Sequence, residues 1–162
     1  MPIGLYIHIP FCETKCSYCD FNTFAGIETL FPQYIDSICK EIKLWGSLIP
    51  DANINTIFFG GGTPSYIPKN LLGQILNTIK EEMDTTNCAE ITIESNPNDL
   101  SEIKKLEYYL DIGINRISIG IQSFNDSHLK SIDRRHSAAE GVHAIKNAES
   151  AGFDNINIDL MF

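Results

Sequence analysis

The sequence lacks an apolar run of membrane length and is short of basic residues. No stretch of about 18 consecutive apolar residues occurs, so no membrane span is expected. The 162 residues include 12 Lys and Arg against 21 Asp and Glu, which gives a formal net charge of -9. Because binding to nucleic acid through its phosphates needs clustered positive charge, we expect no nucleic-acid partner.

A secretory signal is also missing, since no charged segment followed by an apolar one opens the chain. The cysteines stand at positions 12, 16, 19, 39 and 88, and an odd number does not suit a secreted protein held by disulfides. A reducing cytoplasm is therefore the expected location. At this length, a hydrophobic content of 43% predicts one globular domain with a substantial core.

Apolar runs alternate with segments of helical spacing along the whole chain. The apolar runs predict strands at 5–9, 54–59, 89–94, 115–121 and 154–161. The helical spacings predict helices at 32–45, at 68–83, from an N-cap at Ser101, and at 138–151 before Gly152, with a polar loop at 126–134. Strands joined by helices predict an α/β fold with a parallel sheet, either doubly wound or a barrel.

The side-chain alternation within the strands separates these two architectures. In strand 115–121, Arg116, Ser118 and Gly120 share one face and three isoleucines share the other. A parallel sheet covered by helices on both faces would show near-continuous apolar runs instead. We therefore expect helices on one face and a polar lumen, as in an open barrel. An antiparallel sheet with its polar face in water is the alternative, and the intervening helices disfavour it.

Three cysteines, Cys12, Cys16 and Cys19, follow the first predicted strand with the spacing C-x3-C-x2-C. Iron–sulfur clusters and structural zinc sites usually have four protein ligands, so three thiols leave one position open. A [4Fe–4S] cluster with an open iron that binds S-adenosylmethionine (SAM) is one interpretation. A zinc ion completed by His8 or Asp20 is the other.

The other two cysteines do not belong to this group. Cys39 recurs with Ile35 and Ile42 at helical spacing, which indicates a core position, and Cys88 falls in the turn before a strand and receives no role.

Polar residues gather where the predicted strands end. Ligands of parallel α/β folds bind at the carboxyl ends of the strands. Glu94, Gln122 and Asp159 lie at or near three such ends, a glycine-rich turn follows another, and Arg134 lies in a later loop. Each residue alone also fits a structural role, such as a turn, a salt bridge or a strand end. Their shared edge favours one binding site. His8, on the inner face of the first predicted strand, is either a polar core residue or lines the substrate cavity, and we favour the cavity.

Five segments carry a resemblance to a known family. They are LYIHIPFC at 5–12, GGGTPS at 60–65, ESNP at 94–97, NRISIGIQSF at 115–124 and NIDLMF at 157–162. Together with the cysteine spacing they resemble the radical SAM superfamily and, within it, the oxygen-independent coproporphyrinogen III oxidase family. The resemblance runs the whole length of the chain.

This resemblance implies the fold and the domain. It implies about five β/α units from the N-terminal part of a partial TIM-like radical SAM barrel with parallel strands. Residues 1–162 would be a radical SAM core domain, truncated before the remaining barrel strands and a C-terminal domain. We expect such a fragment to be poorly stable and inactive, because its fifth strand would leave an unpaired edge.

The resemblance also implies roles for matching residues. Cys12, Cys16 and Cys19 would ligate the [4Fe–4S] cluster. The implied SAM contacts are Tyr6, Gly61, Gly62, Thr63, Glu94, Gln122, Arg134 and Asp159. In the implied mechanism the reduced cluster passes an electron to the sulfonium, and the resulting 5′-deoxyadenosyl radical abstracts hydrogen from a substrate. No side chain is assigned a catalytic role of its own.

Two branches of the family differ at the cysteine loop. The oxidase branch decarboxylates coproporphyrinogen III to protoporphyrinogen IX and resembles C-x3-C-x-F-C-x-C after an extended N-terminal arm. This sequence has Phe21 at the last cysteine of that pattern and only three residues before Gly4. These departures, with Arg134-Arg135-His136, favour the HemW-type heme chaperone branch, which is thought to deliver heme to apoproteins.

The partners implied by the resemblance are heme or a porphyrinogen, an electron donor such as flavodoxin or ferredoxin, and heme-receiving apoproteins. Three alternatives stay open. They are the oxidase, a non-enzymatic zinc-binding module, and a radical SAM enzyme acting on tRNA or another small molecule.

Overall fold

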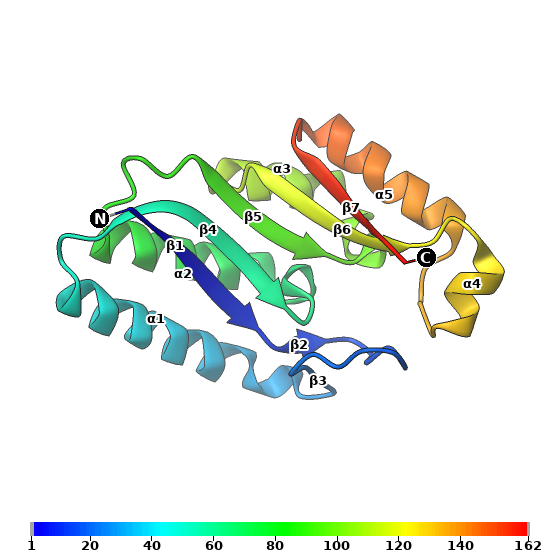
Figure 1. Cartoon of the computed structure of the whole chain (residues 1–162), viewed down its shortest axis with the longest axis horizontal. Coiled ribbons are helices and arrows are strands. Elements are labelled where there is room, and N and C mark those ends of the chain that lie inside the picture. Colours follow the sequence, from blue (N-terminus) through cyan, green and yellow to red (C-terminus); the bar gives the residue numbers. More distant parts are fainter. Residues whose placement is uncertain (1, 162) are drawn as a thin grey trace.

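One parallel sheet organises the chain in the computed structural model, which describes residues 2–161 (Figure 1). Its strands, in spatial order, are β1 (Pro2–Ile9), β4 (Asn53–Gly61), β5 (Glu90–Ser95), β6 (Arg116–Gln122) and β7 (Ile156–Leu160). Every neighbouring pair is parallel. The α/β class, the parallel sheet and the positions of its strands are thus confirmed. Phe162, the last residue of the NIDLMF segment, lies outside the described residues.

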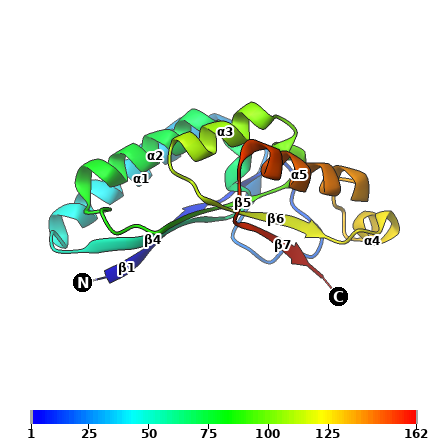
Figure 2. The ribbon, with the colours of Figure 1, turned by 90° about the horizontal axis from the view of Figure 1, so that it is seen from above.

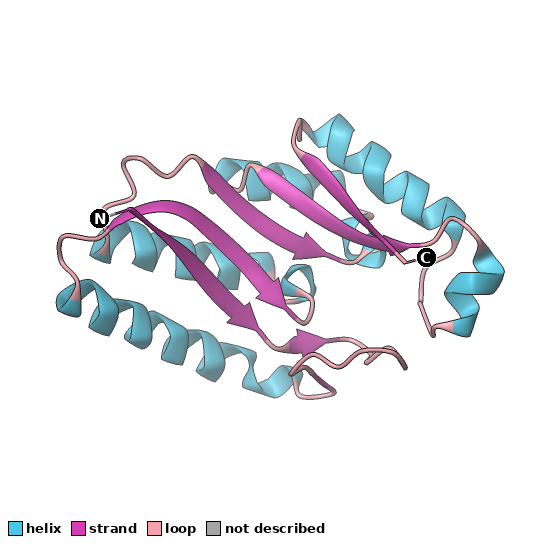
Figure 3. Cartoon of the chain, in the orientation of Figure 1, coloured by secondary structure: helices cyan, strands magenta, loops and turns pink. Residues whose placement is uncertain are grey.

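Four helices cover one face of this sheet. They are α1 (Phe31–Leu48), α2 (Lys69–Glu82), α3 (Ile103–Asp111) and α5 (Ala138–Ala151). Figure 2 shows them above the sheet, and Figure 3 separates helices from strands by colour. The opposite face carries no helix of the described residues. The one-sided cover predicted from the strand alternation is therefore confirmed.

The core lies between the helices and the apolar face of the sheet. Ile93, Ile117 and Ile119 are fully buried there, and the exposed fraction of Cys39 on α1 is 8%. Burying an isoleucine side chain contributes about 1.5–3 kcal/mol, so the alternating isoleucines of the central strands account for much of the cohesion between the two layers. The prediction that Cys39 is a core residue is confirmed.

Two local predictions were wrong. The loop after β6 contains a short helix, α4 (Asp126–Ser131), which has too few residues to show an apolar stripe and is capped by the Asn125 side chain. Ser101 is not an N-cap, because a 3-10 segment, η3 (Pro97–Leu100), precedes it and α3 begins only after Glu102.

Several very short elements went unpredicted because two or three residues carry no periodicity. These are β2 (Phe11–Cys12), β3 (Phe24–Ala25), η1 (Glu28–Leu30) and η2 (Pro64–Tyr66). The pair β2 and β3 matters for the site, because it closes the base of the loop between Cys12 and Phe24.

Helix α5 has the bounds that the sequence predicts. Ser137 and Glu140 form a reciprocal capping box at its N-terminus, and Gly152 ends it with a left-handed φ of 109°. The box fixes the chain just after Arg134 and His136, so the helix start also sets where those two side chains lie. Among residues 2–161, no helix is both long and apolar enough to cross a membrane.

Candidate cluster and SAM site

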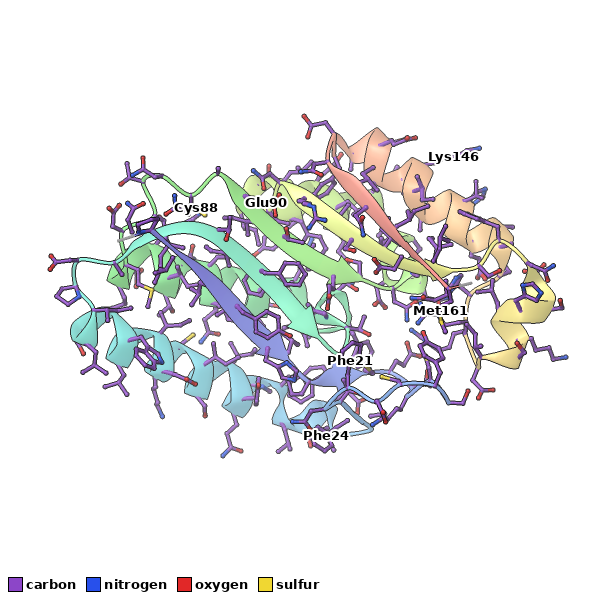
Figure 4. All side chains as sticks on the ribbon, in the orientation of Figure 1. Phe21, Phe24, Cys88, Glu90, Lys146 and Met161 are labelled. Carbon is purple, nitrogen blue, oxygen red and sulfur yellow. The ribbon has the colours of Figure 1, made fainter. Side chains whose placement is uncertain are left out.

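A cavity of about 520 Å³ opens at the carboxyl ends of the strands. Figure 4 shows Phe21 and Met161, which line it, at this end of the sheet, whereas Cys88 and Glu90 lie at the opposite end. The residues singled out from the sequence that line it are Cys12, Cys16, Cys19, Gly61, Gly62, Thr63, Glu94, Gln122, Arg134 and Asp159. The fold thus brings ten of the eleven predicted site residues to one cavity. Only Tyr6 lies elsewhere.

The glycine-rich turn packs directly on the start of the cysteine loop. The backbone N–H of Gly62 donates to the Ile9 carbonyl oxygen at 2.8 Å, and that of Thr63 to the Phe11 carbonyl oxygen at 2.8 Å. A Cβ atom at Gly62 would lie 2.7 Å from the Phe11 carbonyl oxygen and 3.0 Å from the Cys12 sulfur. Glycine is required here because the two backbones approach so closely.

The three thiols face this cavity from a loop with little regular structure. The N–H of Cys19 donates to the Cys16 carbonyl oxygen at 3.1 Å, which folds the loop into a turn. Burial raises the pKa of the Cys12 thiol, and the Thr63 hydroxyl, 3.5 Å from its sulfur, lowers it. Within residues 2–161, no three His, Cys, Asp or Glu side chains converge closely enough to hold one metal ion.

Arg134 connects the cysteine loop to the ends of two strands. Its guanidinium donates to the Asn96 side-chain oxygen at 2.9 Å, to the Gly120 carbonyl oxygen, and to the Cys16 sulfur at 3.6 Å. Burial raises the pKa of the nearby Tyr18, and the charge of Arg134 opposes that rise. The buried Nε of Arg134 has no partner among the described residues. The cavity therefore contains a fixed positive charge beside a thiol.

Two carboxylates line the cavity from β5 and β7, the strands on either side of β6. Glu94 accepts the backbone N–H of Gly61 at 3.0 Å, and Asp159 accepts from Asn157 at 2.9 Å and from Ser118 at 3.3 Å. Burial raises the pKa of Glu94, the Gly61 N–H lowers it, and the charge of Asp159 raises it further. Carboxylates and one guanidinium in the same space suit a ligand that carries both an amine and a carboxylate.

Gln122 reaches the cavity from a strained backbone. Its φ is 64°, a left-handed value, and the pairing of β6 with β7 shifts register between Gly120 and Gln122. Such a bulge redirects a side chain at some cost in backbone strain. His136, which is buried, donates from Nε2 to the carbonyl oxygen of Ile121 at 3.0 Å and so supports the bulge from behind.

Replacing His136 should destabilise the fold through this bulge. We expect His136→Ala to lower the free energy of unfolding by about 1–3 kcal/mol, because the Ile121 carbonyl loses one of its two donors and the buried ring leaves a cavity. Urea unfolding measures the change. His143→Ala is the matched control, since His143 is exposed on α5 and should cost no more than about 0.5 kcal/mol.

The loss of stability in His136→Ala should depend on pH. Burial first, and then the charge of Arg134, lower the pKa of His136 from the usual 6.5. Just below pH 6.5 the unfolded chain therefore binds more protons than the folded one, and the stability that is present above this pH is lost as the pH falls. The His136→Ala variant should show a flatter slope between pH 7 and 5. Parallel slopes would contradict this account.

Tyr6 and His8 lie beneath the glycine turn rather than in the cavity. The Tyr6 hydroxyl is 3.2 Å from His8 Nδ1, and His8 Nε2 is 3.1 Å from the Asn22 carbonyl oxygen. With its proton on Nε2, the imidazole accepts from Tyr6 and donates to Asn22. A Cβ at Gly61 would lie 2.6 Å from the same ring. His8 pairs with Gly60 in the sheet and does not line the cavity at the strand ends, so the expectation that it lines a substrate cavity stays a prediction.

Some lining residues were not singled out from the sequence. Tyr18, Thr23 and Asn96 also line the cavity. Tyr18 stands inside the cysteine spacing and Asn96 inside the ESNP segment, so both motifs contained the signal. No sequence motif pointed to Thr23, because its position depends on how β2 and β3 close the loop.

The fold and the site together define a class of protein. A one-sided parallel α/β sheet with three thiols and a polar cavity at its carboxyl edge is typical of barrel-type enzymes and carriers that hold a metal cofactor. The chain matches the Radical SAM superfamily over residues 6–162, and it belongs to that superfamily. Members of this superfamily use a [4Fe–4S] cluster and SAM.

Three individual proteins of known name are similar to the chain. The chain is 42% identical over 163 residues to the heme chaperone HemW of Buchnera aphidicola (from Schizaphis graminum), covering 99% of this chain and 43% of the relative. It is 37% identical over 161 residues to HemW of Escherichia coli K12, covering 99% and 42%. The solved coproporphyrinogen III oxidase (HemN) of Escherichia coli superposes with a TM-score of 0.91 at 29% identity, covering 99% and 37%.

The match to this oxidase confirms the expected fold, the first part of a TIM-like radical SAM barrel. The chain spans less than half the length of the curated relatives it matches.

Proposed function

We propose that the chain is the cluster- and SAM-binding part of a heme chaperone. The observation that carries this proposal is the single cavity, in which three thiols, a guanidinium and two carboxylates meet. Relatives named heme chaperones share 42% and 37% identity with the chain, whereas the oxidase shares 29%. On this proposal residues 1–162 act as one radical SAM core domain in the cytoplasm.

Cys12, Cys16 and Cys19 would hold the [4Fe–4S] cluster. Two of the thiols already receive donors, from the Thr63 hydroxyl and from Arg134, and hydrogen bonds to sulfur tune such clusters. With SAM bound, the cluster supplies one-electron cleavage of the sulfonium and a carbon radical. The protein's part is to position both groups and to restrict water. An electron donor such as flavodoxin or ferredoxin would reduce the site.

The polar lining would hold SAM by its two ends. Arg134, with its forked donors, suits the methionine carboxylate, and the acceptors at the glycine turn suit the ammonium. Glu94, Gln122 and Asp159 supply oxygen atoms suited to the ribose hydroxyls. Gly61 and Gly62 let the backbone approach the ligand, and Thr63 adds a hydroxyl. Tyr6 would contribute indirectly, through its hydrogen bond to His8, whose ring lies next to the glycine turn.

A zinc module is less well supported than a cluster. Nε2 of His8, one of the two proposed fourth ligands, is bonded to the Asn22 carbonyl oxygen, and Asp20 is exposed. A tetrahedral zinc site needs its ligands to converge on one ion, whereas each iron of a cluster takes its own thiolate. The thiols of Cys12, Cys16 and Cys19 share a cavity but do not converge.

Heme delivery and porphyrinogen decarboxylation can be separated by experiment. Heme should be titrated into the whole protein that carries this chain and followed by its absorption spectrum, beside an anaerobic coproporphyrinogen III turnover assay. We expect saturable heme binding, transfer of heme to an apoprotein, and no protoporphyrinogen IX. Turnover of coproporphyrinogen III without heme binding would overturn the chaperone proposal and support the oxidase.

Glu94→Gln should make the protein more stable and should weaken its binding of SAM. Burial raises the pKa of Glu94 from the usual 4.5, so its contribution to stability is present below that pH and is lost as the pH rises through the folded pKa. The variant should therefore unfold at a higher temperature than the natural protein at pH 7, with the difference vanishing near pH 4.

The same change should weaken SAM binding about tenfold or more, the effect of losing a charged hydrogen bond. Calorimetric titration of the cluster-loaded protein measures this. Unchanged SAM affinity would remove Glu94 from the proposed contacts, without bearing on the stability result.

A further inference from the structure

Two adjacent arginines leave the loop before α5 toward different partners. Arg134 points to the Cys16 sulfur and the end of β6. Arg135 instead forms an ion pair with Glu13, the residue directly after Cys12. Its other terminal nitrogen lies 4.0 Å from Asp99 Oδ1. Arg135 is unused by the proposed cofactor site, yet it connects the cysteine loop to a part of the chain after β5.

The two carboxylates that Arg135 contacts differ in exposure. The exposed fractions of the side chains are 47% for Glu13, 24% for Arg135 and 9% for Asp99. An arginine fork can bridge two acids because its donors are rigid and directed. The guanidinium therefore joins a solvent-facing residue of the loop to an acid inside the fold.

Asp99 is a well-fixed anchor. It belongs to η3 and accepts the Ser65 hydroxyl at 2.8 Å, while Lys105 on α3 donates to the Ser65 carbonyl oxygen at 2.7 Å. Burial raises the pKa of Asp99, and Ser65, Lys105 and Arg135 each lower it. The acid is thus held by segments that follow β4 and β5, independently of the cysteine loop.

The cysteine loop itself has few attachments. Inside it, Lys15 donates to the Phe21 carbonyl oxygen at 3.3 Å. Four side chains from elsewhere in the described chain contact it, namely His8 at Asn22, Arg134 at Cys16, Arg135 at Glu13 and Thr63 at Cys12. Thr63 and Arg135 act at the start of the loop, and of these two only Arg135 does so through an ion pair.

We propose that Arg135 is a positioning residue that clamps the start of the cysteine loop onto Asp99. The clamp keeps Cys12 and Cys16 turned to the cavity before any cluster is present. Its role in cluster loading rests on the proposed function, but its effect on the loop does not. Arg135→Gln breaks both contacts, whereas Glu13→Gln breaks only one, so the arginine variant should have the larger effect.

Hydrogen–deuterium exchange of the metal-free protein tests the clamp directly. We expect Arg135→Gln to speed exchange in residues 13–22 by up to about fivefold, the size expected for a partly exposed ion pair. Glu13→Gln should give a smaller rise, and the double variant should not exceed Arg135→Gln. Arg135→Lys should recover part of the protection, because it keeps the charge but not the fork. Raising the salt concentration should bring the natural protein toward Arg135→Gln.

Lys130→Gln is the matched control, since it removes an exposed positive charge from the preceding helix α4. Exchange in residues 13–22 should not change in this variant. Equal exchange in Arg135→Gln and the natural protein, or additive effects of the two single variants, would overturn the proposal.

A second measurement follows iron release to a chelator from the cluster-loaded protein. Release should be faster in Arg135→Gln by a similar factor, and equal release rates would overturn the clamp's role at the cluster. Neither experiment uses heme. A failure of the clamp therefore leaves the heme proposal standing, and a failure of heme binding leaves the clamp standing.

Discussion

Cys12→Ser, Cys16→Ser and Cys19→Ser should each lose nearly all cluster iron and sulfide after anaerobic reconstitution, against about four irons per chain in the natural protein. Each thiol lines the cavity and no other cysteine is near enough to replace it, because Cys39 is buried in the core and Cys88 lies at the opposite end of the sheet (Figure 4). Iron and sulfide analysis with absorption spectroscopy measures the loss.

The remaining cysteines are the controls. Cys88→Ser should keep full iron content, and Cys39→Ala should keep it while lowering the free energy of unfolding by about 1 kcal/mol. If any single serine variant of the trio retained a full cluster, that thiol would not be a ligand. Zinc without iron or sulfide in the anaerobically purified natural protein would instead select the zinc module.

Gly62→Ala should damage the same site through backbone packing. The added methyl group would meet the Phe11 carbonyl oxygen at 2.7 Å, and backbone cannot swing aside as a flexible side chain can. We expect the free energy of unfolding to fall by about 1–3 kcal/mol. Cluster content should fall severalfold, because relief of the clash moves Cys12. Chemical denaturation and iron analysis measure the two effects.

Gly26→Ala is the matched control for this substitution. Gly26 has a φ of 74° but no described residue within 4 Å of the added methyl, so it carries backbone strain without a clash. It should cost about 1–2 kcal/mol and leave cluster content unchanged. If both glycine variants lowered cluster content equally, general destabilisation and not the approach to Cys12 would be the cause.

The positions of the strands along the chain and the sidedness of the sheet could be predicted because they depend on local patterns. The alternation of residues such as Ile117 and Ser118 indicates which face of the sheet is apolar. The helical spacing around Ile35 and Cys39 indicates which side of the helix is buried. The expected site followed from one topological fact, that parallel strands end at the same edge. Short elements could not be predicted, because α4 and the pair β2 and β3 contain too few residues to show a periodic pattern.

By itself the sequence determined the α/β class, the cysteine trio and the edge at which polar residues gather. Only the tertiary structure decided that His8 lies under Gly61, that His136 supports the strained Gln122, and that Arg135 reaches Glu13 across 122 positions of the chain. The physical reason is that sequence patterns reflect interactions between residues close together in the chain. Periodicity records what each residue needs from its own helix or strand, whereas a contact between distant loops depends on how the finished sheet places them.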